Sequence, residues 1–186
     1  MWRPGVLALL PMPQLPETDR LALRPITEAD YDLYYLLNTE PEVMRHIGAP
    51  RSPEVVREYL RNMAADYTRW PGLGRWFTVE KATGAVVGIH LFKPLENTEH
   101  IELGYRLLPA YWGRGYATEM GRALVRYGFE QLQLPRVVGV TSPENVDSQR
   151  VLEKCGLRFQ RMAHFYGAEQ RFYALDNPAA ASVAPQ

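Results

Sequence analysis

The stretch Leu107-Leu108-Pro109-Ala110-Tyr111-Trp112-Gly113-Arg114-Gly115-Tyr116-Ala117-Thr118-Glu119 decides how this chain folds. It joins a strand-like run at residues 100–108 to a helix-like run at residues 117–132. A glycine-rich turn that leads directly into a helix points several backbone N–H groups at one spot, at the positive end of the helix dipole. The stretch therefore predicts a turn that binds phosphate, and it leaves the kind of phosphate ligand open.

The turn lacks the features of two common nucleotide loops. No Gly-Lys-Ser/Thr sequence follows, so it is not a Walker loop. The third glycine of the dinucleotide fingerprint is missing too. A Gly-x-Gly sequence before a helix also occurs where tight packing is the only requirement, so a second motif is needed to identify a ligand.

The segments around the turn predict a mixed sheet. Alternation of polar and apolar residues predicts a first strand, and further runs predict a meander and then a closing hairpin around Gly167. The predicted strands are 20–25, 75–80, 85–92, 100–108, 136–141, 157–164 and 170–175. A strand on each side of the helix at 117–132 implies a parallel crossover, which is nearly always right-handed.

Capping signals place the other helices. Thr27 followed by Asp30 resembles a capping box, Ser52-Pro53-Glu54 is a strong helix start, and Gly156 ends a helix that begins near Glu144. A short helical turn is expected at 41–47. The predicted fold is α/β, with a mixed, mostly antiparallel central sheet and flanking helices.

The length and composition of the chain narrow the kinds of protein that it can be. The 186 residues suit one domain at 17–177, with a flexible leader at 1–16 and a flexible tail at 178–186. With 21 basic and 21 acidic residues the net charge is zero, which argues against a general nucleic-acid binder. The apolar run 6–10 is too short for a signal peptide or a membrane span. A single cysteine, Cys155, allows no internal disulfide and suits the cytoplasm. The spacing of the histidines and the cysteine predicts no metal site.

The second motif is Pro143-Glu144-Asn145-Val146-Asp147-Ser148-Gln149-Arg150-Val151-Leu152-Glu153-Lys154-Cys155-Gly156-Leu157. On a helix, Asn145, Ser148 and Leu152 share one face because they are three and four residues apart. Taken alone, Asn145 is more often a capping residue. Ser148 taken alone is more often a solvent-facing serine.

Together the two motifs resemble the GNAT superfamily of N-acetyltransferases. The resemblance rests on residues 111–119, 145–148 and 153–157, and on 18–25 and 42–47 near the start of the chain. It covers about residues 18–176. The most similar branch contains the ribosomal-protein N-terminal alanine acetyltransferases. The resemblance implies a GNAT-like acyltransferase fold and acetyl-CoA as the cosubstrate.

The resemblance also implies which residues bind acetyl-CoA. Backbone N–H groups of the turn would hold the pyrophosphate, and the strand before it would pair with the pantetheine arm. Asn145 would orient the pantetheine or a water. The expected binding residues are Arg106, Leu107, Leu108, Trp112, Gly113, Arg114, Gly115, Tyr116, Ala117, Thr118 and Asn145. The first position of the turn is usually Gln or Arg in this family, whereas here it is Trp112.

The implied reaction is direct attack of an amine on the thioester. Glu102 is the expected general base, with an exposed strand residue or a salt-bridge partner as the alternative role, and His100 is a weaker candidate on the same strand face. Many members place a tyrosine where this chain has Leu152, so the resemblance assigns the general-acid role to Ser148. A backbone N–H of residues 106–108 would hold the oxyanion.

The acceptor expected from this branch is a protein N-terminal α-amino group or a small primary amine. An α-amino group has a pKa near 8 and needs less help from a base than a lysine. The sequence leaves the oligomeric state open, with a homodimer among the alternatives. A non-catalytic acyl-CoA-binding sensor or docking domain, or nucleotide binding by the same turn, are the rival readings.

Overall fold

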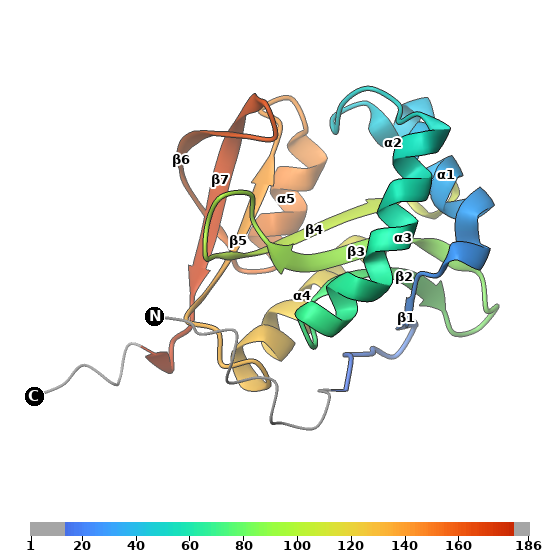
Figure 1. The fold of residues 1–186 in the computed structure, drawn as a ribbon. Coiled ribbons are helices and arrows are strands. Elements are labelled where there is room, and N and C mark those ends of the chain that lie inside the picture. The colour runs from blue at the N-terminus through green and yellow to red at the C-terminus, as the bar shows by residue number, and fades with distance from the viewer. Residues whose placement is uncertain (1–13, 181–186) are drawn as a thin grey trace, which may run out of the picture.

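The computed structural model describes residues 14–180, which form one seven-stranded sheet with helices on both faces (Figure 1). The strand order is β1-β2-β3-β4-β5-β7-β6. The helices and strands in chain order are β1 (Leu21–Pro25), α1 (Tyr31–Thr39), α2 (Pro41–Met44), α3 (Pro53–Arg69), β2 (Gly74–Glu80), β3 (Val86–Pro94), β4 (Ile101–Leu107), α4 (Tyr116–Glu130), β5 (Arg136–Thr141), α5 (Val146–Lys154), β6 (Arg158–Phe165) and β7 (Ala168–Asp176). The predicted α/β class and mostly antiparallel sheet are confirmed.

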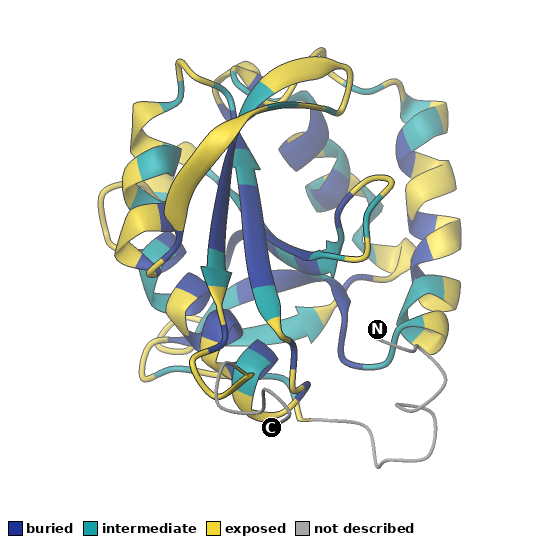
Figure 2. Ribbon diagram, turned by 90° about the vertical axis from the view of Figure 1, so that its left-hand side faces the viewer, coloured by how far each residue is buried: buried dark blue, intermediate teal, exposed yellow. Residues whose placement is uncertain are grey.

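Two apolar layers hold the helices to the sheet. Helices α4 and α5 pack on one face, where Met120, Leu124 and Leu152 join Leu103 and other strand residues. Helices α1 to α3 pack on the opposite face, over β1 to β3. Figure 2 shows buried segments along the strands, while β6 at the edge of the sheet is largely exposed. Alternation along the strands therefore contributes to both cores, and a third, smaller cluster contains Leu95, Val138, Phe172 and Ala174.

The predicted ends of the helices agree with their caps within a few residues. The Ser52 hydroxyl accepts the N–H of Val55 at 3.4 Å where α3 begins. The Asp30 carboxylate accepts the N–H of Thr27 at 2.9 Å, so the expected capping box is present. The box encloses a single 3-10 turn, Glu28–Asp30, and α1 begins directly after it at Tyr31. These local signals set where each helix starts.

One parallel strand pair positions the site. β4 and β5 lie parallel, as the predicted crossover requires, but they are paired only at Ile101–Val137 and Glu102–Val138. Beyond Glu102 the two strands are no longer paired, whereas β5 stays paired with β7 through Thr141. The carboxyl half of β4 therefore presents an unpaired backbone edge toward β5.

The leader and tail expected at 1–16 and 178–186 fall mostly outside the described residues, which begin at Gln14 and end at Ala180. Within the part that is described, no helix is both long enough and apolar enough to cross a membrane.

Candidate functional site

The glycine turn has a free set of backbone donors. Gly113 and Gly115 have φ of +73° and +80°, a left-handed conformation that glycine adopts without strain. Gly115 is the N-cap of α4. Within residues 14–180 the N–H groups from Gly113 to Thr118 donate to no other group, whereas the N–H of Trp112 is bonded to the carbonyl of Pro109. The space beside Gly113 is open, since an added Cβ there would meet no atom within 4 Å. The turn can therefore offer its donors to an anion.

Contacts from both sides fix the turn. Arg20 forms an ion pair with Glu119 in the first turn of α4, and Arg20 Nη2 donates to the carbonyl oxygen of Arg114 at 3.2 Å. Beneath the turn, Nε2 of the fully buried His90 lies 3.4 Å from the carbonyl oxygen of Ala117. The donors are thus held in place before any ligand arrives.

Alternate residues of β4 direct their backbone groups toward β3 and toward the gap beside β5. The N–H of Leu108 donates to the carbonyl of Val87 on β3 at 3.0 Å. Because backbone groups alternate in direction along a strand, Arg106 and Leu108 face β3, while Tyr105 and Leu107 face the gap. The Trp112 indole donates to the Leu107 carbonyl at 2.8 Å, which leaves the N–H of Leu107 toward the gap. Of the three residues expected to pair with pantetheine, only Leu107 has its backbone directed there.

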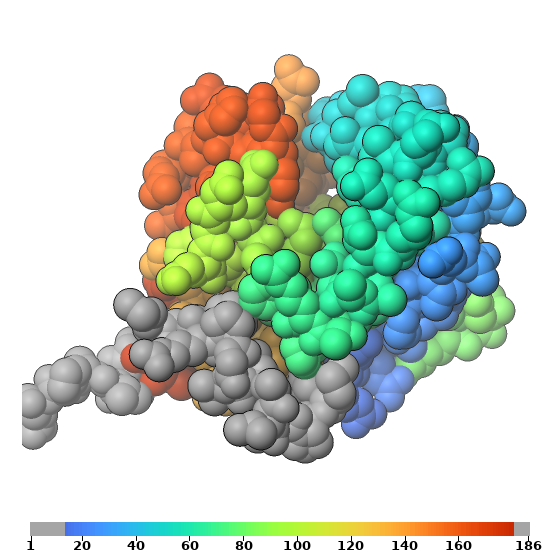
Figure 3. Space-filling view, viewed as in Figure 1, coloured from blue at the N-terminus to red at the C-terminus, as the bar shows by residue number. Residues whose placement is uncertain are grey.

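A cavity of about 260 Å³ opens where the two strands diverge. Its lining comes from β4, from β2 and β3, from the α1–α3 region, from β5 and α5, and from the β6–β7 turn. Figure 3 shows a hollow on this face between the C-terminal strands and the helices α2 and α3. The cavity thus connects the α1–α3 side of the sheet with the side that carries α5.

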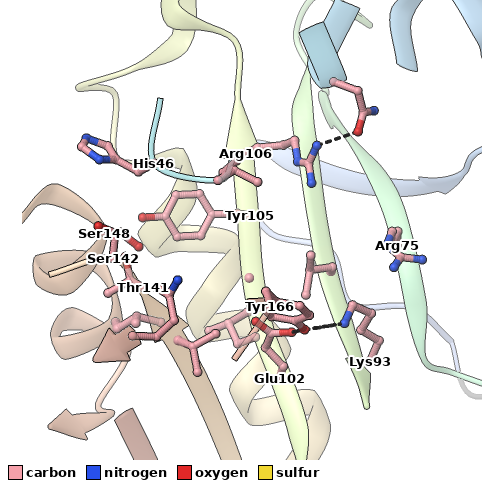
Figure 4. A pocket seen from close by; sticks show the side chains of 18 of the residues that line it. His46, Arg75, Lys93, Glu102, Tyr105, Arg106, Thr141, Ser142, Ser148 and Tyr166 are labelled. Carbon is pink, nitrogen blue, oxygen red and sulfur yellow. Dashed lines mark hydrogen bonds and ion pairs between the residues drawn. The ribbon is translucent and has the colours of Figure 1, made fainter. Parts of the chain in front are cut away.

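Glu102 lies in the floor of this cavity and is held by two neighbours (Figure 4). Its side chain is 7% exposed, and Lys93 Nζ lies 3.2 Å from Glu102 Oε2. The Tyr166 hydroxyl donates to the same carboxylate oxygen at 2.5 Å. Burial lowers the pKa of Lys93, although the Glu102 charge opposes this. Burial and the Glu102 charge raise the pKa of Tyr166.

Ser148 lies on the opposite side of the cavity, on α5. The Tyr105 side chain also lines the cavity, and in Figure 4 its ring points toward Ser148. Burial raises the pKa of Tyr105 to about 12, so this hydroxyl stays protonated at neutral pH. Asn145 caps α5, because its Oδ1 accepts the N–H of Ser148 at 3.1 Å. The amide nitrogen of Asn145 and the second lone pair of Oδ1 remain for another partner.

A third group of side chains is cationic. Arg106 Nη1 donates to Asn38 Oδ1 at 2.8 Å, and Asn38 Nδ2 donates to the carbonyl of Tyr34 at 2.6 Å. Burial, with the charges of Arg75 and Arg51 contributing, lowers the pKa of Arg106. All three arginines line the cavity.

Glu102, Ser148 and Arg106, three residues named in the sequence analysis, all line this one cavity. His100 does not line it, and its ring lies 6.4 Å from that of Phe172. Cys155 is buried in the core, and burial raises its thiol pKa to about 11. Within residues 14–180 no group of three or more His, Cys, Asp or Glu could hold a metal ion.

Sequence reasoning missed five residues that line the cavity, namely Arg51, Arg75, Lys93, Tyr105 and Tyr166. The hairpin between β3 and β4 places Lys93 opposite Glu102, a signal that could have been found from the register alone. Tyr166 is 64 residues from Glu102 and gave no such signal.

Comparisons with known proteins agree with this geometry. Residues 20–158 match a family model described as an acetyltransferase (GNAT) domain. FsC-acetyl coenzyme A-N(2)-transacetylase of Aspergillus fumigatus is 37% identical over 153 residues, which cover 75% of this chain and 63% of that protein, less than two thirds of its length.

Solved structures share the fold. The acetyltransferase from Agrobacterium tumefaciens strain C58 is 29% identical with a TM-score of 0.76, and the match covers 86% of this chain and 92% of that one. RimL, a ribosomal L7/L12 alpha-N-protein acetyltransferase solved in complex with coenzyme A, is 17% identical with a TM-score of 0.73. That match covers 89% of this chain and 98% of the other, and at this identity it shows a common fold alone.

Proposed function

Because this chain belongs to the GNAT family and is therefore an acetyl-CoA-dependent N-acetyltransferase, we propose that it acetylates a protein N-terminal α-amino group or a small primary amine by direct attack. The amine nitrogen forms a bond to the thioester carbonyl carbon, and the bond from that carbon to sulfur breaks. The Aspergillus fumigatus relative is named as an acetyl coenzyme A-N(2)-transacetylase, which supports a nitrogen acceptor.

Acetyl-CoA binding rests on the turn and on the unpaired edge of β4. The free N–H groups from Gly113 to Thr118 would hold the pyrophosphate at the N-terminus of α4, where the helix dipole favours an anion. The side chain of Arg114 lies over the Tyr111 ring, with 5.2 Å between the guanidinium carbon and the ring centroid, and is exposed enough to meet a phosphate. The N–H of Leu107, which faces the gap, would pair with the pantetheine arm or hold the oxyanion.

Glu102 would take the proton that the amine loses. The carboxylate is buried, lines the cavity and lies beside the point where β4 and β5 separate. Lys93 and Tyr166 orient it through contacts to the same oxygen, Oε2. An acceptor amine that reaches this cavity can give up its proton to Glu102 directly or through a water.

Ser148 would deliver a proton to the departing sulfur. Its backbone position is fixed by the Asn145 cap, and the Tyr105 side chain, whose pKa is raised by burial, points toward it in Figure 4. This pair occupies the region where many relatives are expected to use a tyrosine at the Leu152 position. Leu152 itself is buried and packs into the core.

The observation that carries this proposal is the placement of Glu102 and Ser148 on opposite sides of one cavity at the β4–β5 gap. The test is thiol release from acetyl-CoA with a panel of primary amines and short peptides, alongside titration calorimetry with acetyl-CoA. Glu102→Gln should lower kcat by about 100-fold and Ser148→Ala by about 10-fold or more. Both should keep the affinity for acetyl-CoA.

Glu153→Gln, at an exposed acid on α5 outside the cavity, is the matched control and should leave turnover unchanged. Binding of acetyl-CoA with no thiol release for any acceptor would overturn the proposal. Unchanged turnover in Ser148→Ala would remove that residue from the reaction.

A further inference from the structure

The acceptor side of the cavity has a strong local excess of positive charge. Lys93, Arg51, Arg75 and Arg106 all line it, whereas Glu102 is its only carboxylate among residues 14–180. Lys93 already neutralises that carboxylate. The whole chain has no net charge, so this excess is a property of the cavity rather than of the protein.

The three arginines have little compensation of their own. Within the described residues, Arg106 and Arg51 form no ion pair, and the one formed by Arg75, with Asp66, is long at 3.8 Å. Arg106 is bonded through Nη1 to neutral oxygens, those of the Asn38 amide and the Leu37 carbonyl. A guanidinium has five donors, so most of those on Arg106 remain available.

The register places these charges beside the reaction point. Arg106 and Glu102 are on the same face of β4, with Gly104 between them. Arg75 on β2 is paired with Leu91 on β3, and Leu91 is paired with Gly104 on β4. Arg75 therefore lies in the same cross-strand row as Gly104. Gly104 carries no side chain of its own, and the Leu91 side chain packs over it, because a Cβ added there would lie 3.0 Å from Leu91 Cδ1. An acceptor that lies over Leu91 and Gly104 therefore has the carboxylate of Glu102 on one side and guanidinium groups on the other.

Resting on the proposed function, we infer that the acceptor is an amine that also carries a carboxylate, such as a free amino acid. The carboxylate would bind Arg106 with Arg75 and Arg51, and the amine would lie toward Glu102 and the β4–β5 gap. Guanidinium groups match carboxylates through paired hydrogen bonds. A plain amine enters as a cation and meets three guanidinium groups that Glu102 does not neutralise, so the same cavity disfavours polyamines.

Matched acceptors test this inference. Phenylalanine, leucine and methionine are compared with their decarboxylated amines and with their amides in the thiol-release assay. Of the three acceptors, the amide has the amino group with the lowest pKa, so the largest fraction of it is neutral and able to attack at neutral pH. The availability of neutral amine alone would therefore favour the amide. The acids should nevertheless give a kcat/KM at least about 10-fold above both analogues, as the loss of one charged hydrogen-bonded partner predicts.

Variants separate this acceptor site from the rest of the enzyme. Arg106→Gln and Arg51→Gln should raise KM for the amino acid about 10-fold, should lower rather than raise KM for the decarboxylated amine because one repelling charge is gone, and should keep acetyl-CoA affinity. Arg51→Gln serves as the second variant because Arg106→Gln also removes a buried hydrogen bond to Asn38. Arg61→Gln, at an exposed position of α3 outside the cavity, is the control.

The outcomes are distinct for the two proposals. Equal or better use of the decarboxylated amines or the amides overturns the inferred acceptor class and leaves the acetyltransferase reaction intact. Absence of thiol release with every acceptor, despite bound acetyl-CoA, overturns the proposed reaction and the acceptor class with it.

Discussion

The buried imidazole of His90 predicts a loss of stability on acidification. His90 is fully buried under the N-terminus of α4, with Nδ1 2.7 Å from the Thr78 hydroxyl and Nε2 3.4 Å from the Ala117 carbonyl. Burial lowers the pKa of His90 from 6.5 to about 4, although the hydrogen bond to Ala117 opposes this. The native protein therefore keeps this ring neutral at pH values where the unfolded chain protonates it.

The sign and size of the effect follow from this difference in pKa. Below pH 6.5 the unfolded state binds a proton that the native state excludes, so the free energy of unfolding falls as the pH falls toward 4. At about 1.4 kcal/mol per pH unit, the interval corresponds to a loss of up to roughly 3 kcal/mol. The full contribution is present above pH 6.5.

The assay is urea unfolding followed by tryptophan fluorescence, at about pH 7.5 and about pH 4.5, for the wild type and His90→Gln. Glutamine keeps a donor and an acceptor near Thr78 and Ala117 but does not titrate. Carboxylates titrate alike in both proteins, so they cancel in the difference between them. Acidification should cost the wild type about 2–3 kcal/mol more than the variant. An equal loss in both proteins would refute the assignment, as would a His90 ring that titrates near pH 6.5 in the native state by NMR.

Three further predictions concern the turn, the core and a cap. Gly115→Asp should weaken acetyl-CoA binding in calorimetry by more than about 100-fold, because a carboxylate about 4 Å from a phosphate costs about 4 kcal/mol near a protein surface. Gly115→Ala is the uncharged control, and equal loss in both would point to backbone strain instead. Gly128→Ala should lower the free energy of unfolding in urea by about 1–3 kcal/mol, since its Cβ would lie 2.7 Å from Phe92 Cζ, and an unchanged midpoint would contradict this. The Arg24 guanidinium lowers the pKa of Asp30 from 3.8 to about 2, so Asp30→Asn should cost about 1 kcal/mol at neutral pH, reduced because Arg24 is partly exposed. That difference should close as the pH falls from about 4 through about 2, and a difference that persists there would contradict the assignment.

Much of the fold is predictable because its signals are local. The alternation at 75–80 and 85–92, the cap at Ser52 and the double glycine before α4 each act within a few residues, and the observed elements follow them closely. The parallel pairing of β4 with β5 also follows, since a strand, a helix and a strand in succession have one preferred connection.

The site is less predictable because it depends on register and on distant packing. The Asn145–Ser148 motif is local, and the structure shows that its asparagine caps the helix that presents the serine. The partners of Glu102 come from β3 and from the turn between β6 and β7. The register of the β3–β4 hairpin relates Lys93 to Glu102, whereas no short-range pattern relates the β6–β7 turn to β4.

The sequence by itself determined the glycine turn and the class of fold, because backbone preferences and capping act over three or four residues, and the family resemblance added Glu102 and Ser148 as candidate catalytic residues. The tertiary structure alone decided that Leu107 rather than Leu108 faces the gap, and that arginines from three separate segments share one cavity with Glu102. The physical reason is that the pairing of the strands, and the point where they diverge, determine which charged side chains lie close to one another. The secondary-structure propensities of neighbouring residues do not encode this pairing.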